Sequence, residues 1–228
     1  MSAIVPVYNG AGTLAEAIES ILAQEFRPLD IIVVDDGSTD ATSEVVKRFA
    51  DRVIAIRQDN LGPGAARNAG IARTARPFVA FLDADDVWPA TALASHLDSL
   101  AAKADAAVAW GQSTHVVRAG GSPPRDDWHG RPQWALSVGS MLFRRSVFDE
   151  VGAFDPALRV GEDLDLMLRI VERRIVVERH AHVVCERRFH PGNVTRDEAA
   201  VDWAYFSAVK KAFARRRSAA GRKADPRT

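Results

Sequence analysis

The stretch FVAFLDADDVW, from Phe78 to Trp88, decides the fold. It opens with five apolar residues, and a run this short predicts a strand buried on both faces of a sheet. The run ends in Asp83, Asp85 and Asp86, three acids that repel one another unless a cation lies between them. Carboxylates at a strand end suit Mg²⁺ or Mn²⁺, especially where a substrate brings phosphates. The alternative is an acidic turn that caps the next helix, and this stretch alone does not decide between the two.

Upstream segments alternate between strand-like and helix-like patterns. Apolar runs predict strands at 3–7, 31–34, 53–56 and 78–83. Apolar residues at helical spacing predict a helix after each of the first two strands, and a glycine-rich loop leads into a third helix over 65–75. Thr13 and Glu16 fit a capping box at the start of the first helix. Strands joined by single helices predict right-handed crossovers and a mostly parallel α/β sheet.

Polar residues follow three of these strands, in the clusters 6–9, 35–39 and 83–86. The carboxyl ends of parallel strands meet at one edge of a sheet, which is where open α/β sheets bind ligands. We therefore expect the three clusters to lie together and to form a ligand site.

The second half of the chain is less regular. Its predicted strands are 106–110, 141–143, 175–177 and 182–185, and its predicted helices are 93–100, 164–171 and 201–214. Residues 119–132 and 188–195 predict loops. A frayed basic tail is predicted over 215–228; its positive charge suits an anionic membrane surface, and the alternative is a solvated end.

Composition narrows the class of protein. A chain of 228 residues with 47% hydrophobic residues predicts one globular domain. Lys and Arg balance Asp and Glu at 30 each, and no basic face interleaved with aromatic residues is visible, which argues against nucleic-acid binding. The single Cys185 excludes an internal disulfide and suits a reducing compartment. No membrane span or signal peptide is visible, so we expect a soluble cytoplasmic protein.

Seven stretches, in order along the chain, resemble the family 2 glycosyltransferases, enzymes of the GT-A fold. They are VPVYNG from Val5, VVDDGSTDAT from Val33, DNLGPGAARNAG from Asp59, FLDADD from Phe81, VGAFDPAL from Val151, GEDLDLMLR from Gly161 and RFHPGNVT from Arg188. The resemblance implies transfer of one sugar, with inversion, from a nucleotide diphosphate sugar to an acceptor hydroxyl. The resemblance also implies UDP as the favoured nucleotide and Mn²⁺ or Mg²⁺ as the metal. It implies a glycan or lipid-linked acceptor and a role in cell-surface polysaccharide or glycolipid synthesis.

The resemblance also implies an organisation within one structural domain. A nucleotide-sugar-binding half would span 1–110, an acceptor-binding and catalytic-base half 111–200, and a terminal helix with the basic tail 201–228. The residues matched to nucleotide binding are Pro6, Tyr8, Asn9, Asp36, Arg67 and Asp85.

Metal and catalytic roles fall on the other matched residues. Asp85, Asp86 and His190 match metal ligands, and Asp163 matches the catalytic base. Glu162 and Asp83 are the residues that we assign to the acceptor or substrate. An acceptor hydroxyl is a weak nucleophile, and Asp163 could take its proton as the new bond forms.

Each role has a structural alternative. Asp36 suits a turn acid before Gly37, and Asp163 suits an acid that stabilises a helix N-terminus. His190 suits a solvated loop histidine, and Trp88 suits core packing better than sugar stacking. His180 and His182 share one strand face, but no third ligand has suitable spacing for a metal site.

Two other functions compete with sugar transfer. A nucleotidyltransferase would use a similar sheet and similar acids, but it would need basic residues in the first loop, and 8–13 contains no Lys or Arg. A nucleotide-sugar-binding protein without catalysis would not need Asp85, Asp86 and Asp163 together. Trp110, Trp128 and Trp134 bracket the expected acceptor region without indicating which of them contacts a sugar.

Overall fold

A computed structural model of the chain describes residues 1–118, 120–121, 129–190 and 198–223. Its seven-stranded sheet has the order β3-β2-β1-β4-β6-β5-β7. The strands are β1 (Ser2–Val7), β2 (Asp30–Asp35), β3 (Ile54–Arg57), β4 (Phe78–Phe81), β5 (Val108–Val117), β6 (Met141–Arg144) and β7 (Val177–Phe189). β6 pairs antiparallel with β4 and with β5, whereas the other pairs are parallel. The predicted mostly parallel α/β sheet is confirmed.

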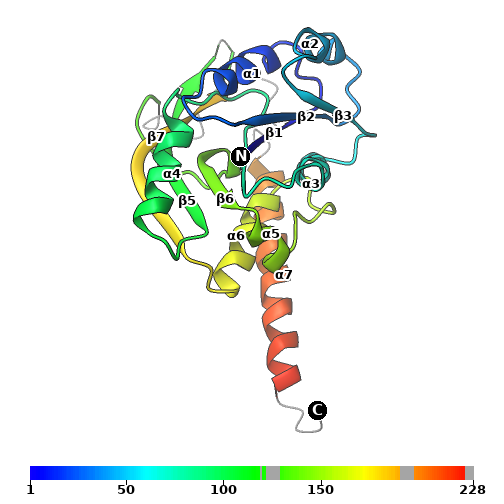
Figure 1. The fold of residues 1–228 in the computed structure, drawn as a ribbon. Coiled ribbons are helices and arrows are strands. Elements are labelled where there is room, and N and C mark those ends of the chain that lie inside the picture. Colours follow the sequence, from blue (N-terminus) through cyan, green and yellow to red (C-terminus); the bar gives the residue numbers. More distant parts are fainter. Residues whose placement is uncertain (119, 122–128, 191–197, 224–228) are drawn as a thin grey trace.

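Helices cover both faces of the sheet (Figure 1). They are α1 (Leu14–Leu22), α2 (Thr42–Arg48), α3 (Pro63–Arg73), α4 (Ala92–Ala102), α5 (Ser146–Val151), α6 (Glu162–Glu172) and α7 (Glu198–Lys223). Because side chains alternate along a strand, β1 sends Ala3, Val5 and Val7 into one core cluster and Ile4 into the other. The first cluster packs against α1, α2 and α4, and the second against α3, α5 and α6.

Two details at the start and end of the sheet differ from prediction. Thr13 makes no side-chain hydrogen bond at the start of α1, and Glu16 binds the side chain of Arg188 instead, so the predicted capping box is wrong. The two strands predicted at 175–177 and 182–185 are one continuous strand, β7. Its polar middle lies along the sheet edge, where β7 pairs with β5, and register shifts around Gln112 absorb the irregularity.

The C-terminal segment is more ordered than predicted. α7 continues to Lys223, and Arg215 pairs with Asp165 and Glu172 of α6, so the described part of the predicted tail is helical. Residues 224–228, and the parts of the predicted loops at 119, 122–128 and 191–197, lie outside the described residues. None of the described helices is long and apolar enough to span a bilayer.

Candidate active site

The loops after β1 and β2 are joined by hydrogen bonds at the carboxyl edge of the sheet. Asn9, whose φ is +53°, accepts hydrogen bonds at Oδ1 from the backbone N–H groups of Thr39 at 2.8 Å and Asp40 at 3.3 Å. Its own N–H donates to Ser38 Oγ at 2.9 Å. Asn tolerates this left-handed conformation better than most residues. As predicted from the topology, the first two polar clusters lie together.

The residues matched to nucleotide binding surround this junction. Asp36 is buried, and its carboxylate accepts hydrogen bonds from Gln58 Nε2 and from the N–H groups of Leu61 and Gly62. It therefore shapes the loop that leads into α3. Tyr8 is 50% exposed, which leaves its ring accessible at the same edge. Pro6 is buried in β1 beside Val34 of β2.

Arg67 joins the two halves of the site. Its guanidinium is buried and lies 2.7 Å from an Asp83 oxygen and 2.5 Å from a Glu162 oxygen. Burial alone would lower the pKa of Arg67, but the carboxylates of Asp83 and Glu162 outweigh burial and raise it. Arg67 therefore ties α3 to the end of β4 and to the first turn of α6, and it neutralises part of their charge.

Asp85 and Asp86 have different surroundings. Asp85 is partly exposed, and its Oδ2 lies 3.2 Å from His190 Nε2. Burial and the charge of Asp83 raise its pKa. Asp86 is only 4% exposed, and its Oδ1 accepts a hydrogen bond of 2.8 Å from the N–H of Arg188. Burial and the Asp85 charge hold the pKa of Asp86 well above its usual range.

Asp163 lies in the first turn of α6, just after Gly161 in the left-handed region at φ +80°. Its Oδ1 accepts a hydrogen bond from the Leu164 N–H at 3.2 Å. Burial and the neighbouring Glu162 charge raise its pKa to about 6, against the opposing effect of Arg67. A carboxyl group in this range is a base at neutral pH and holds a proton in mildly acidic solution.

Sequence reasoning missed two residues of this region. Arg187 on β7 is placed among the acids: burial lowers its pKa, and Asp86 and then the more distant acids raise it. Tyr205 on α7 has a pKa raised by burial and by the charge of Asp163. Neither residue follows a recognisable spacing, because β7 and α7 reach the acids only through the fold.

A divalent cation suits this set of donors. Burial raises the pKa values of Asp85, Asp86 and Asp163, the charges of neighbouring acids raise them further, and the nearby cations do not offset these effects. The described residues contain no group of three His, Cys, Asp or Glu side chains arranged to hold a metal by themselves. Mg²⁺ normally takes one or two protein carboxylates and completes its shell with water and substrate phosphates, and the partly exposed carboxylate of Asp85 fits that pattern.

Other candidate residues lie elsewhere. Trp88 is buried, and its indole N–H donates to the Gly139 carbonyl, so the core-packing interpretation is confirmed. His180 Nε2 lies 2.9 Å from His96 Nδ1, so this nitrogen of His180 is hydrogen-bonded within the protein. Trp110 and Trp134 pack edge to face with ring centroids 5.8 Å apart. Trp128 lies outside the described residues.

The architecture and its acidic carboxyl edge define a GT-A fold, as predicted. The chain belongs to the glycosyl transferase family 2, whose family model matches residues 2–152. It is 36% identical over 190 residues to succinoglycan biosynthesis protein ExoO of Rhizobium meliloti, an alignment that covers 72% of this chain and 53% of ExoO.

Solved structures share the fold. S. aureus TarS 1-349 in complex with UDP-GlcNAc matches with a TM-score of 0.70 and 20% identity, over 86% of this chain and 60% of that chain. The mannosyltransferase PcManGT from Pyrobaculum calidifontis, in complex with GDP-Man and Mn²⁺, matches with a TM-score of 0.64 and 23% identity, over 94% of this chain and 63% of that chain. The chain thus spans about half of ExoO and less than two thirds of each of these structures.

Proposed function

We propose that this chain is an inverting, metal-dependent glycosyltransferase that moves one sugar from a nucleotide diphosphate sugar to an acceptor hydroxyl. The observation that carries the proposal is the placement of Asp163: a carboxyl group with a pKa of about 6 lies beside acids whose charge is only partly compensated. One group is thus suited to accept a proton, and its neighbours are suited to bind a cation.

Donor binding is assigned to the carboxyl edge. Tyr8 would stack on the nucleotide base, and Asn9 and Asp36 would hold the loops around it, with Pro6 supporting the first loop from β1. Asp85, with His190 or Asp86, would hold a divalent cation, and that cation would supply neutralisation of the diphosphate charge as the nucleotide leaves. TarS 1-349 is in complex with UDP-GlcNAc and PcManGT is in complex with GDP-Man and Mn²⁺, which supports this donor class; we favour UDP.

Proton transfer is assigned to Asp163. It would take the proton of the acceptor hydroxyl as the oxygen bonds to the anomeric carbon and the bond to the diphosphate breaks. A single displacement of this kind inverts the anomeric configuration. Arg67 is a positioning residue, because it holds Asp83 and Glu162 beside the base from the opposite side of the site. Glu162 and Asp83 would border the acceptor.

The ExoO relationship supports a role in polysaccharide synthesis, with a glycan or lipid-linked acceptor. We assign donor binding to 1–110, acceptor binding and the base to 111–200, and the terminal helix to 201–228. The first loop, between β1 and α1, carries no Lys or Arg to hold a triphosphate, which weighs against nucleotidyl transfer.

The test is nucleotide release from UDP-, GDP- and dTDP-sugars, with Mn²⁺ and a panel of simple sugar acceptors. We expect release of a nucleoside diphosphate with one donor and a product of inverted anomeric configuration by NMR. Asp163→Asn should lower the rate by about 10²- to 10⁴-fold, the usual value of a general base. Asp149→Asn changes an exposed side chain on α5; it is the matched control and should leave the rate unchanged. An undiminished rate in Asp163→Asn would remove the base assignment, and release of pyrophosphate would indicate nucleotidyl transfer.

A further inference from the structure

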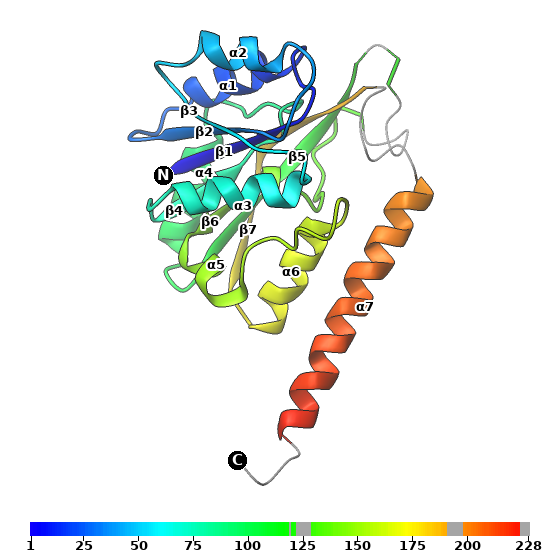
Figure 2. The ribbon, with the colours of Figure 1, turned by 90° about the vertical axis from the view of Figure 1, so that its right-hand side faces the viewer.

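One face of α7 packs against α6, and Figure 2 shows the C-terminal end of the helix extending beyond the body of the protein. Ala208 and Ala212 on this face are buried. Lys211 lies 2.5 Å from an Asp155 oxygen, and Arg215 lies 2.8 Å from an Asp165 oxygen. These contacts determine which side of the helix faces the protein and which side faces away.

The opposite face of α7 carries aromatic rings in solvent. Trp203, Phe206 and Phe213 are 69%, 60% and 61% exposed. At roughly 100° per residue, these rings fall with Lys210 and Arg217 in one arc of roughly 80°, opposite Ala208 and Ala212. Three large apolar side chains on one exposed helix face indicate a contact surface. We call these five residues the outward face of α7.

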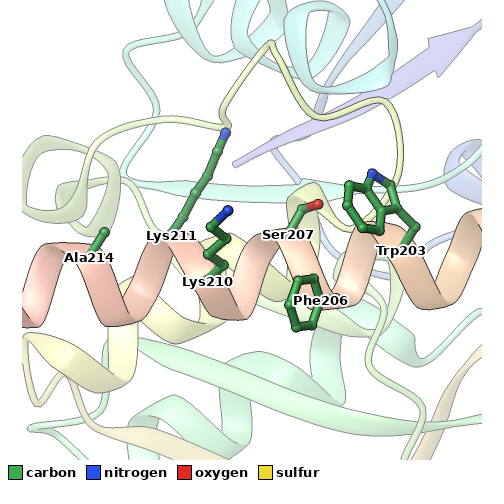
Figure 3. Close-up of a pocket in the computed structure, with 6 residues that line it drawn as sticks. All are labelled: Trp203, Phe206, Ser207, Lys210, Lys211 and Ala214. Carbon is green, nitrogen blue, oxygen red and sulfur yellow. The ribbon is translucent and has the colours of Figure 1, made fainter.

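Charge determines what fits this face. The described side chains of α7, at 202–203 and 205–217, include five Lys or Arg residues and a single acid, Asp202. Lys211 and Arg215 are paired with acids of the body, so Lys210, Arg216 and Arg217 set the charge of the exposed side. Figure 3 shows Lys210 beside Phe206, with Trp203 further along the same helix, around a hollow that these side chains line.

We propose that the outward face of α7 binds the surface of an anionic lipid bilayer. Aromatic rings favour the level of the lipid headgroups, and each Lys or Arg near an anionic surface adds attraction. Lys and Arg side chains between the rings fit a helix that lies at a shallow depth in the bilayer. Their methylene groups would then lie along the acyl chains, and their charges would reach the headgroups. A second copy of the chain fits less well, because a symmetric pairing of this face would bring like cations together.

The position of α7 links this surface to the active site. α7 contacts α6, and Arg215 of α7 pairs with Asp165, two residues after Asp163 in the first turn of α6. A helix lying on a bilayer would therefore present the acidic edge close to the lipid surface, where a lipid-linked hydroxyl would be found. This link to the acceptor rests on the proposed function, whereas binding of the helix to lipid does not.

The test is sedimentation of the full chain with phosphatidylcholine vesicles, with and without phosphatidylglycerol. We expect binding to the anionic vesicles, weakened by salt. Lys210→Glu with Arg217→Glu should lower the affinity by about thirty-fold or more, from two lost attractions. Trp203→Ser, Phe206→Ser and Phe213→Ser combined should also lower it strongly.

Matched controls separate these effects from general damage. Val171→Ser removes an apolar side chain that is 59% exposed on α6, and Lys103→Glu reverses an exposed charge after α4; neither should change binding. Melting curves check that each variant folds. The proposal is overturned if the wild-type chain does not bind anionic vesicles, or if the outward-face variants bind them as tightly as the wild type does. It is equally overturned if the aromatic variant turns a dimer into a monomer in sedimentation equilibrium while vesicle binding is absent.

Discussion

Two acids in the first turn of α6 lie two residues apart and meet opposite environments. Asp165 points to the seam between α6 and α7, where its carboxylate lies 2.9 Å from Arg169 Nε and 2.8 Å from Arg215 Nη1. Asp163 points to the carboxyl edge of the sheet, where Glu162 and Asp83 surround it and Arg67 is shared among the acids. The charge of Asp165 is therefore neutralised by its own arginines, whereas Asp163 shares one arginine with other acids.

The difference separates stability from function. A buried acid with its own cations contributes to folding only while both partners remain. A group of acids with too few cations costs folding energy, and such groups concentrate at sites that bind something positive or move protons. The carboxyl edge has this second character in Asp85, Asp86 and Asp163, whereas the α6–α7 seam has the first.

The largest expected effect on folding is at the seam. Asp165→Asn leaves the guanidinium of Arg169 without its charge partner, and it removes one of the two acids that hold Arg215. Removing one member of a buried ion pair costs about 3–5 kcal/mol. Urea denaturation should show this loss in the free energy of unfolding. A change below about 1 kcal/mol would mean that the seam is not held by charge.

Asp163→Asn should change the free energy of unfolding in the opposite direction and stabilise the protein. Its folded-state pKa of about 6 lies above that of an unfolded Asp, so its ionised form is the costly one, and the stability that it contributes is lost as pH rises through 6. Removing the charge should therefore raise the free energy of unfolding at pH 8 by roughly 1–2 kcal/mol. Urea denaturation of the wild-type and Asp163→Asn chains at pH 8 measures this change. Destabilisation by Asp163→Asn would place Asp163 with Asp165 as a structural acid.

The pH dependence of transfer sharpens the contrast. If Asp163 is the base, the reaction needs its deprotonated form, so kcat/KM should fall about tenfold per pH unit below a midpoint near 6. The measurement is a pH–rate profile of the wild-type chain with saturating Mn²⁺. Asp165 has no part in proton transfer, so a folded Arg215→Ala variant should keep the same midpoint. A flat profile between pH 5 and 7 would contradict the assignment.

The smallest effect is expected at an exposed ion pair. Arg145 and Asp149 lie one turn apart on the surface with N···O at 3.3 Å. Pairs of this kind stabilise helices by about 0.3–0.5 kcal/mol, and salt screens them. Asp149→Asn should therefore shift the urea midpoint only slightly, and less in high salt. A loss comparable to that of Asp165→Asn would show that burial does not separate the two kinds of acid.

Much of the fold could be predicted because local patterns and the core agree. Short apolar runs and helical spacing indicated the strands and helices of the first half, and the topology brought the polar clusters after β1 and β2 to one edge. β7 was divided in the prediction because Glu178, Arg179 and His180 interrupt its apolar pattern, although backbone pairing with β5 resumes at Val183. The order of α7 beyond Ala214 depends on Arg215 reaching α6, which no local pattern reveals.

The candidate site was partly predictable for a similar reason. Asp83, Asp85 and Asp86 are visible as neighbours in sequence, and Asp163 lies within a stretch that resembles the family. The bridge from Arg67 to Glu162 spans 95 residues, and the approach of Arg187 and Tyr205 to the acids depends on how β7 and α7 pack. Charge balance between distant segments arises only in the folded chain, so no residue spacing in the sequence predicts it.

The most direct test of the account is the thermal stability of the chain with UDP, with Mn²⁺, and with both. A ligand that binds only the native state raises the melting temperature by mass action. We predict a clear rise only when UDP and Mn²⁺ are present together, and loss of that rise in a folded Asp85→Asn variant, because the acids and the diphosphate share the cation. GDP and dTDP in place of UDP identify the donor class. A rise with nucleotide that is unchanged by EDTA and by Asp85→Asn would contradict the claim that the undercompensated acids form a cation and diphosphate site.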